Sequence, residues 1–222
     1  MENNVTTHQN NSVHGDDSLL TVKVDNETFI DAVMDGVTDH GGAEASNAVK
    51  ERIQSDKPTT TEEIENLLSD LNTEFYQVGG GRFLLTTASI VITTAAHIYV
   101  VAVGDSPIYL LQNGDFSQLS GRIGGLLRLT ASSAVGAQSS LTFQTHDCPI
   151  SSGDKLLIVS DGISDNLELN EIQEFMTTIQ NTEELVQTLE TTSAERTQRG
   201  GTPTSMRGRV RNDDRSIIAR FF

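Results

Sequence analysis

Two short apolar runs in this chain end in the same dipeptide, Asp-Gly. One covers residues 28–34 and stops at Asp35-Gly36, and the other covers residues 156–159 and stops, one residue later, at Asp161-Gly162. Each run is too short for a helix and is bounded by turn residues, which is typical of a buried strand. A carboxylate at the end of such a strand, followed by a glycine with no side chain in the way, can reach a metal ion at the rim of a sheet.

Two further pairs of carboxylates stand beside strand-like runs. Asp16-Asp17 precedes the run at 19–24, and Asp213-Asp214 precedes the terminal run at 216–222. Any one of these features is explained as well by a turn, because Asp-Gly is a common hairpin turn and paired aspartates are ordinary where a strand begins. Four acidic strand ends together favour one shared cation site.

Taken in order, these motifs resemble those of the metal-dependent protein serine/threonine phosphatases, the type 2C family. The resemblance runs from about Gly15 to the C-terminus and indicates a compact microbial member. Its five motifs are His14-Gly15-Asp16-Asp17-Ser18, Asp35-Gly36 with His40-Gly41-Gly42-Ala43-Glu44, Val103-Gly104-Asp105-Ser106, Ser160-Asp161-Gly162, and Asp213-Asp214 with Ser216.

The resemblance implies a phosphatase that hydrolyses phosphoserine and phosphothreonine with a water shared by two tightly bound Mn²⁺ or Mg²⁺ ions. It implies that Asp35 bridges the ions, that Asp35 and Asp161 carry catalysis, and that Asp105 holds a third, looser ion. The implied metal ligands are Asp17, Asp35, the carbonyl of Gly36, Asp105, Asp161 and Asp213. Such ions prefer oxygen ligands, and the water they activate makes a covalent enzyme intermediate unnecessary.

The other patterns predict helices and antiparallel strands. Helices are expected from residue 42 to 52, after Pro58 with Thr60 and Glu63 as a capping box, and at 170–179 and 182–195. Asn113-Gly114 predicts a hairpin turn. Strands without regular helix alternation favour an α+β fold. The resemblance implies a four-layer α/β/β/α sandwich of two antiparallel sheets flanked by helices.

We expect a single catalytic domain at 14–222, which is long enough to bury its own core. Residues 1–13 are predicted to be a disordered tail, because the segment is rich in Asn and Thr and has almost no apolar content. It has neither the basic start nor the apolar centre of a signal peptide. A single cysteine, Cys148, is compatible with a reducing compartment, and a cytoplasmic location is expected. The protein is also expected to be a monomer.

The charge of the chain bears on its partners. A net charge of −16 argues against nucleic acid, which is bound through Lys and Arg. Residues 84–104 carry no formal charge over a length that could cross a membrane, but their Thr, Ser and His content and β-branched residues favour strands. The expected partner is a phosphoprotein substrate, with no nucleic acid and no membrane.

One departure from the family concerns phosphate binding. The family commonly has an arginine five residues before the first metal aspartate, and this chain has Ser12 there. Seven of the 15 Lys and Arg residues follow position 195. We hypothesise that Arg207, Arg209 or Arg211 supplies the missing phosphate contact and that residues 197–212 close over the phosphoryl group, because a guanidinium binds phosphate through two bonds. The alternative is a solvated loop that balances the acidic body.

Two other function classes remain open. A phosphatase-fold binding module with weak or no catalysis is favoured by the missing arginine, but the retention of every metal aspartate argues against it. A protein that holds structural Ca²⁺ would be expected to cluster its ligands within one loop, whereas these carboxylates are scattered along the chain.

Overall fold

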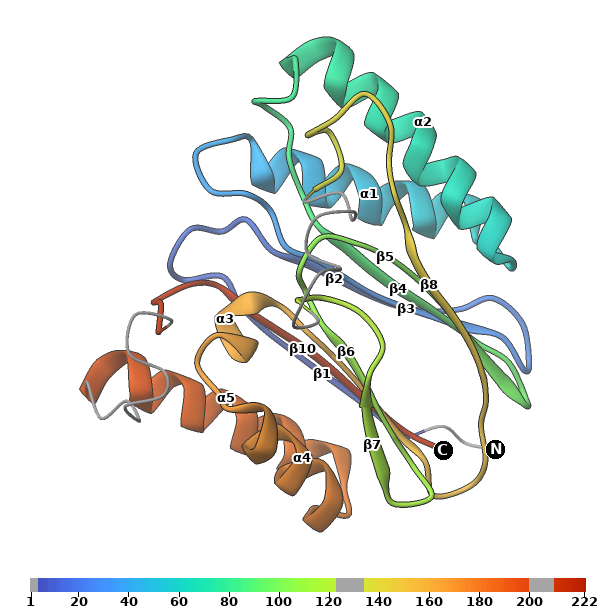
Figure 1. The fold of residues 1–222 in the computed structure, drawn as a ribbon, viewed down its shortest axis with the longest axis vertical. Coiled ribbons are helices and arrows are strands. Elements are labelled where there is room, and N and C mark those ends of the chain that lie inside the picture. Colours follow the sequence, from blue (N-terminus) through green and yellow to red (C-terminus); the bar gives the residue numbers. More distant parts are fainter. Residues whose placement is uncertain (1–3, 123–133, 200–209) are drawn as a thin grey trace.

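The computed structural model describes residues 4–122, 134–199 and 210–222, and in them two antiparallel sheets lie face to face (Figure 1). In order across the first sheet are β1 (Asn4–Asn10), β10 (Arg215–Phe221), β9 (Lys155–Val159), β6 (Ile108–Gln112) and β7 (Asp115–Gln118). In order across the second are β2 (Ser18–Lys23), β3 (Phe29–Met34), β4 (Ala88–Thr93), β5 (His97–Val103) and β8 (Gln144–Pro149).

Helices cover the outer face of each sheet. Two long helices, α1 (Gly42–Asp56) and α2 (Thr61–Gly79), lie over the second sheet (Figure 1). The first sheet is covered by α3 (Asp161–Ser164), α4 (Leu169–Thr178) and α5 (Thr182–Arg199). The structure therefore confirms the expected α+β sandwich of two antiparallel sheets between helical layers.

The second helix shows how local sequence signals produce these layers. The Thr60 hydroxyl accepts a 3.2 Å hydrogen bond from the Glu63 N–H, and the Glu63 carboxylate accepts one of 3.2 Å from the Thr60 N–H, which is the predicted capping box. The apolar residues at steps of three and four from Ile64 to Phe75 are buried against the sheet. Val78, one residue before the end of the helix, is 73% exposed and lies outside this buried face.

Three apolar cores hold the four layers together. One lies between α1, α2 and the second sheet, one between the α4–α5 layer and the first sheet, and one between the two sheets. The middle core includes Val91, Val100, Ile158 and Ile218, all of which are fully buried. Each such side chain contributes about 1.5–3 kcal/mol through burial. Stacking the sheets fixes their edges relative to one another, which is what a site between them requires.

The N-terminal segment differs from the expectation of a disordered tail at 1–13. Residues 4–10 form β1, which pairs antiparallel with β10 along its whole length, from Asn4 opposite Phe221 to Asn10 opposite Arg215. Without β1, strand β10 would present an unpaired edge. Val5 packs against the core between the sheets, and the Thr6 hydroxyl lies 2.7 Å from that of Thr182 on α5. The polar composition reflects an edge strand rather than disorder.

Among the helices that the structure describes, none is long and apolar enough to span a membrane. The uncharged stretch at 84–104 instead supplies β4 and β5, which pair with each other and lie inside the second sheet.

Candidate metal and catalytic site

The two Asp-Gly strand ends meet between the sheets. Asp35 directly follows β3 in the second sheet, and Asp161 follows β9 in the first and begins α3. The Asp161 N–H donates a 3.3 Å hydrogen bond to Oδ2 of Asp35. Asp17, just before β2, and Asp213, just before β10, bring the remaining acidic ends to this edge, since the charge of Asp17 acts on Asp35 and the charge of Asp213 acts on Asp161.

Glycine is required at two of these strand ends by close packing of the backbone. A Cβ on Gly36 would lie 2.5 Å from the carbonyl oxygen of Asp16 and 2.5 Å from the carbonyl carbon of Gly42. A Cβ on Gly162 would collide with the carbonyl oxygen of Asp214. The glycines therefore allow the acidic segments to approach each other closely.

The clustered carboxylates disfavour each other's charge. Burial raises the pKa of Asp35 well above its ordinary value, and the charges of Asp161, Asp17 and Asp105 raise it further. Burial, followed by the charges of Asp105 and Asp213, raises the pKa of Asp161 to about 7. Such an arrangement is costly unless cations neutralise it.

Asp17 has the same character. It is 4% exposed, and burial raises its pKa to about 7, although the hydroxyls of Ser216 and Ser160 offset part of the effect. Burial also raises the pKa of Asp213. Within the described ranges, Oδ2 of Asp17 is buried and has no hydrogen-bond partner.

The donor atoms fit a hard divalent cation. They are carboxylate oxygens and a backbone carbonyl, which Mg²⁺ and Mn²⁺ prefer, and the unpartnered Oδ2 of Asp17 needs a positive partner. In the part of the chain that the structure describes, no three His, Cys, Asp or Glu side chains lie close enough together to hold a metal ion in their present orientations. Binding would therefore require side chains to rotate toward the ion.

Asp214, the second member of its pair, binds backbone rather than facing the cluster. Its carboxylate accepts hydrogen bonds from the N–H groups of Val13 (3.0 Å), His14 (3.0 Å), Gly15 (2.6 Å) and Asp16 (2.8 Å). Burial alone would raise the pKa of Asp214, but these four donors lower it below its ordinary value. Asp214 thereby fixes the segment that leads into Asp17.

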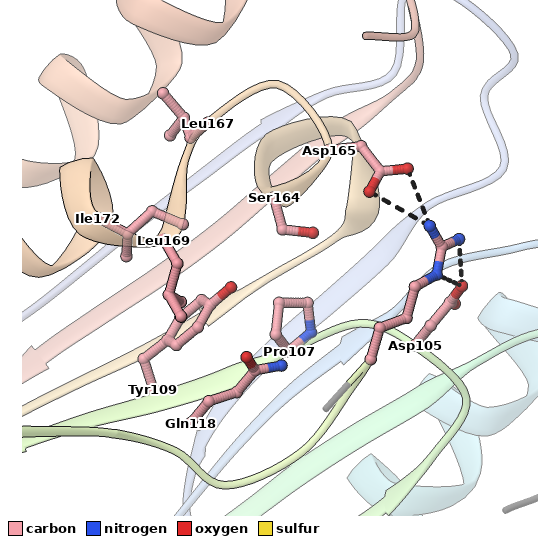
Figure 2. A pocket seen from close by; sticks show the side chains of 10 residues that line it. Asp105, Pro107, Tyr109, Gln118, Ser164, Asp165, Leu167, Leu169 and Ile172 are labelled. Carbon is pink, nitrogen blue, oxygen red and sulfur yellow. Dashed lines mark hydrogen bonds and ion pairs between the residues drawn. The ribbon is translucent and has the colours of Figure 1, made fainter. Parts of the chain in front are cut away.

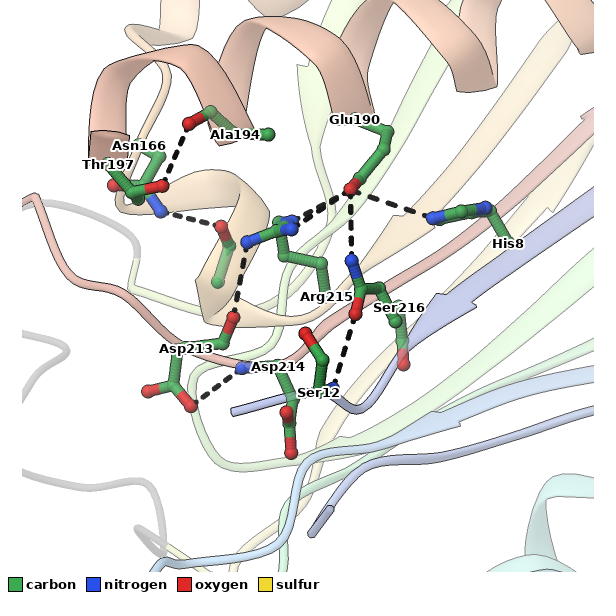
Figure 3. A network of polar contacts seen from close by, with 12 residues as sticks. His8, Ser12, Asn166, Glu190, Ala194, Thr197, Asp213, Asp214, Arg215 and Ser216 are labelled. Atoms are coloured by element: carbon green, nitrogen blue, oxygen red, sulfur yellow. Dashed lines mark hydrogen bonds and ion pairs between the residues drawn. The ribbon is translucent and has the colours of Figure 1, made fainter. Parts of the chain in front are cut away.

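Three arginines near the C-terminus are bound to acidic partners. Arg215 contacts Glu190 of α5 at 2.8 and 3.0 Å, beside Asp213 and Asp214 (Figure 3). Arg196 pairs with Glu171, and Arg220 pairs with Asp31. These three side chains serve the fold.

Of the three arginines hypothesised to bind phosphate, Arg207 and Arg209 lie outside the described residues. Arg211 is exposed, and its charge offsets a small part of the rise that burial causes in the pKa of Asp213. Its backbone is held by buried Asn166, whose amide donates to the Arg211 carbonyl at 2.8 Å and to the Gly162 carbonyl at 2.7 Å. The backbone of Arg211 is therefore held in place next to Asp213, at the acidic edge.

Sequence reasoning missed two residues at the site, Arg122 and Asp165. The Arg122 guanidinium contacts Asp105 at 2.8 Å through Nε and Asp165 at 3.2 and 3.3 Å through one terminal nitrogen (Figure 2). Its other terminal nitrogen is 4.0 Å from Asp161. Asp165 had a readable signal, because it follows Asp161 by one helical turn. Arg122 had no such signal, because nothing in the neighbouring sequence predicts that its side chain contacts Asp105 and Asp165.

A cavity of about 160 Å³ opens beside these three residues. Its walls combine Asp105, Arg122 and Asp165 with Pro107, Tyr109 and Leu169 (Figure 2). The site is thus an acidic edge flanked by a partly apolar hollow.

Solved structures share this fold over nearly the whole chain. Serine/threonine phosphatase Stp1 from Staphylococcus aureus superposes with a TM-score of 0.76 at 16% identity, covering 98% of this chain and 94% of that one. The catalytic domain of the serine/threonine protein phosphatase PstP, in complex with two manganese ions, gives 0.73 at 20% identity and covers 99% and 97%. RsbX in complex with magnesium gives 0.71 at 20% identity and covers 99% and 96%.

A match to a family model defines the class of this protein, which is a protein serine/threonine phosphatase and therefore a hydrolase. The chain belongs to the protein phosphatase 2C family, whose sequence pattern matches residues 6–198. No curated protein sequence matches it. The family resemblance inferred from the five acidic motifs is confirmed.

Proposed function

We propose that this phosphatase hydrolyses phosphoserine and phosphothreonine in proteins and depends on two Mn²⁺ or Mg²⁺ ions. The residues that would hold them are Asp17, Asp35, the Gly36 carbonyl, Asp161 and Asp213. Asp105, which the family resemblance assigns to a third, looser ion, is not among the ligands of these two. The observation that carries the proposal is the 3.3 Å contact between Asp161 and Asp35, two partly buried carboxylate residues at the ends of strands from different sheets, whose pKa values are both raised. When bound, such ions supply an activated water and neutralise the charge of the phosphoryl group.

The chain's own residues hold this site in place. Asp214 fixes residues 13–16, and Asn166 ties α3 to the segment before Asp213. The apolar core behind β3 and β9 lowers the local dielectric, which strengthens attraction between the carboxylates and a cation. Cys148 is not a rival nucleophile, because burial raises the pKa of its thiol and it lies on β8.

The substrate's phosphate is proposed to contact Arg207, Arg209 or Arg211, with residues 197–212 closing over it. Support comes from the position of Arg211, whose backbone is held beside Asp213. Replacing all three arginines by glutamine should raise KM for a phosphopeptide and leave Mn²⁺ affinity unchanged. An unchanged KM would show that these arginines do not bind the phosphate and only balance the acidic surface charge.

The partner is proposed to be a phosphoprotein in the cytoplasm, bound by a monomer, with neither nucleic acid nor membrane involved. The net charge of −16 supports the exclusion of nucleic acid. A catalytically weak binding module is the second candidate, and it is favoured by exposed Ser12 at the place of the family's arginine.

Phosphate release from a phosphothreonine peptide separates the two candidates. The protein should turn over the peptide with Mn²⁺ or Mg²⁺ and should lose this activity in EDTA, because its aspartates supply no nucleophile of their own. Absence of turnover with every divalent cation tested, over a panel of phosphopeptides, would favour the binding module.

A further inference from the structure

Arg122 lies among three carboxylates at the outer side of the acidic edge. Its guanidinium contacts Asp105 at 2.5 and 2.8 Å and Asp165 at 3.2 Å, and it comes within 4.0 Å of Asp161. The three aspartates come from two parts of the chain: Asp105 follows β5, whereas Asp161 begins α3 and Asp165 directly follows it. Each of the three side chains comes within 4.0 Å of the guanidinium, Asp105 and Asp165 through hydrogen bonds and Asp161 only at 4.0 Å.

The contacts are more specific than those of a surface ion pair. Asp165 and Asp161 are largely buried, with side chains 6% and 17% exposed, whereas Arg122 is 40% exposed. The guanidinium therefore reaches inward from the rim to carboxylates that are mostly shielded from water. Among the described residues, Arg122 is the one cationic side chain within 4 Å of Asp105 or Asp161. A planar fork suits such multiple carboxylate contacts better than a lysine does.

We propose that Arg122 is a built-in counter-ion that takes the place of an outer divalent cation between Asp105, Asp161 and Asp165. This inference rests on the proposed metal-dependent function, because it concerns how many ions that site accepts. With Arg122 in place, Asp105 is occupied by a guanidinium and is not free as a ligand. The enzyme would then work with two inner ions and exclude a third.

The consequence is a competition that can be measured. An ion approaching Asp105 must displace the guanidinium and also overcome repulsion from its positive charge. Removing the charge should therefore open an additional ion site, and retaining it as lysine should not. Loss of a positive charge elsewhere should have no effect on the number of ions.

The test is calorimetric titration of Mn²⁺ into metal-stripped protein, for the wild type and for Arg122→Gln, Arg122→Lys and Arg52→Gln. Arg52 is the control, because it is likewise an arginine paired with a carboxylate, but its partner Asp56 lies on the exposed surface of α1, away from the acidic edge. The wild type should bind two ions. The Arg122→Gln protein should bind a third, on the order of tenfold more tightly than any third ion in the wild type. The lysine and Arg52 variants should resemble the wild type.

The outcomes separate this inference from the proposed function. Equal ion numbers and affinities in the wild type and Arg122→Gln would overturn it, whether or not the wild type has phosphatase activity. If the wild type binds no ions and the glutamine variant does, the counter-ion role stands and the two-ion function fails. If neither protein binds an ion, both are overturned.

A measurement on the wild type covers the case in which Arg122→Gln does not fold. With ¹⁵N-arginine labelling, the Nε–H signal of Arg122, assigned from the Arg122→Lys spectrum, should stay protected from solvent exchange while two equivalents of Mg²⁺ are added. It should become exchange-broadened only at a large excess, when the ion displaces it from Asp105. Loss of protection with the first two equivalents would contradict the inference.

Discussion

The backbone N–H of Asp161 donates a hydrogen bond to the carboxylate of Asp35 at 3.3 Å, and this contact joins the end of β9 in one sheet to the end of β3 in the other. The acidic edge therefore exists only when both sheets are folded and stacked. Its geometry depends on the core between them as much as on its own side chains.

The metal-free protein should become less stable as the pH rises from about 4 to about 7. Burial raises the pKa of both Asp17 and Asp161 from 3.8 to about 7, so the folded state binds these protons more tightly than the unfolded state does. The contribution of these two residues to the free energy of unfolding is fully present below about pH 4 and is lost as the pH rises through about 7. Unfolding in urea with EDTA should show a loss of about 2 kcal/mol or more between pH 5 and pH 8.

Two comparisons test that assignment. Asp161→Asn should flatten the pH dependence, and saturating Mn²⁺ should reduce it, because the ion offsets the carboxylate repulsion. Asp214 has a lowered pKa, so its own contribution is lost only as the pH falls below its ordinary range and leaves this window unaffected. Stability that stays constant or rises between pH 5 and pH 8 in EDTA would contradict the prediction.

Asp214→Ala should loosen the segment that carries Asp17. Four backbone N–H groups lose their acceptor, which should lower the free energy of unfolding by roughly 2–4 kcal/mol. Hydrogen exchange of the amides at 13–16 should accelerate more than exchange elsewhere. Asp25→Ala is the control, since Asp25 accepts two backbone N–H bonds in an exposed turn. Equal effects of the two substitutions would deny Asp214 a special role.

Asp31 and Arg220 form a buried ion pair that aligns the strands leading to the site. Both side chains are at most 1% exposed, with contacts of 2.5 and 2.8 Å, and they join β3 to β10. Arg220→Met alone should destabilise the fold by about 3–5 kcal/mol, because it leaves Asp31 buried without its partner. The double variant Asp31→Leu with Arg220→Met should lose less free energy of unfolding than Arg220→Met alone, because it leaves no unpaired buried charge. A double variant that is as unstable as the sum of the singles, measured by chemical denaturation, would rule out this coupling.

Local sequence signals predicted the parts of the fold that local chemistry controls. The capping box at Thr60, the hairpin at Asn113-Gly114 and the Asp-Gly strand ends all depend on neighbouring residues, and the structure contains each of them. The structure brings the ends at Asp35 and Asp161 together, while their role as metal ligands stays a prediction.

Other features depend on contacts between distant segments, so the sequence could not supply them. Strand β1 is stabilised by pairing with β10 at the far end of the chain. Asp214 binds residues 13–16, and Arg122 spans from the end of one hairpin to α3, so neither role is visible in local spacing. Paired aspartates such as Asp213 and Asp214 look alike in sequence, yet one lies toward the carboxylate cluster and the other holds a loop.

The most direct test of the account is phosphate release from a phosphothreonine peptide in Mn²⁺ by the wild type, Asp35→Asn and Asp39→Asn. Asp39 is an exposed neighbour in a left-handed backbone conformation that asparagine tolerates, so it controls for loss of a nearby charge. Asp35→Asn should lower kcat by at least about a hundredfold while the protein stays folded by circular dichroism, because the proposed bridge between the ions is removed. Asp39→Asn should retain near wild-type turnover. Full activity in Asp35→Asn would contradict the proposed site.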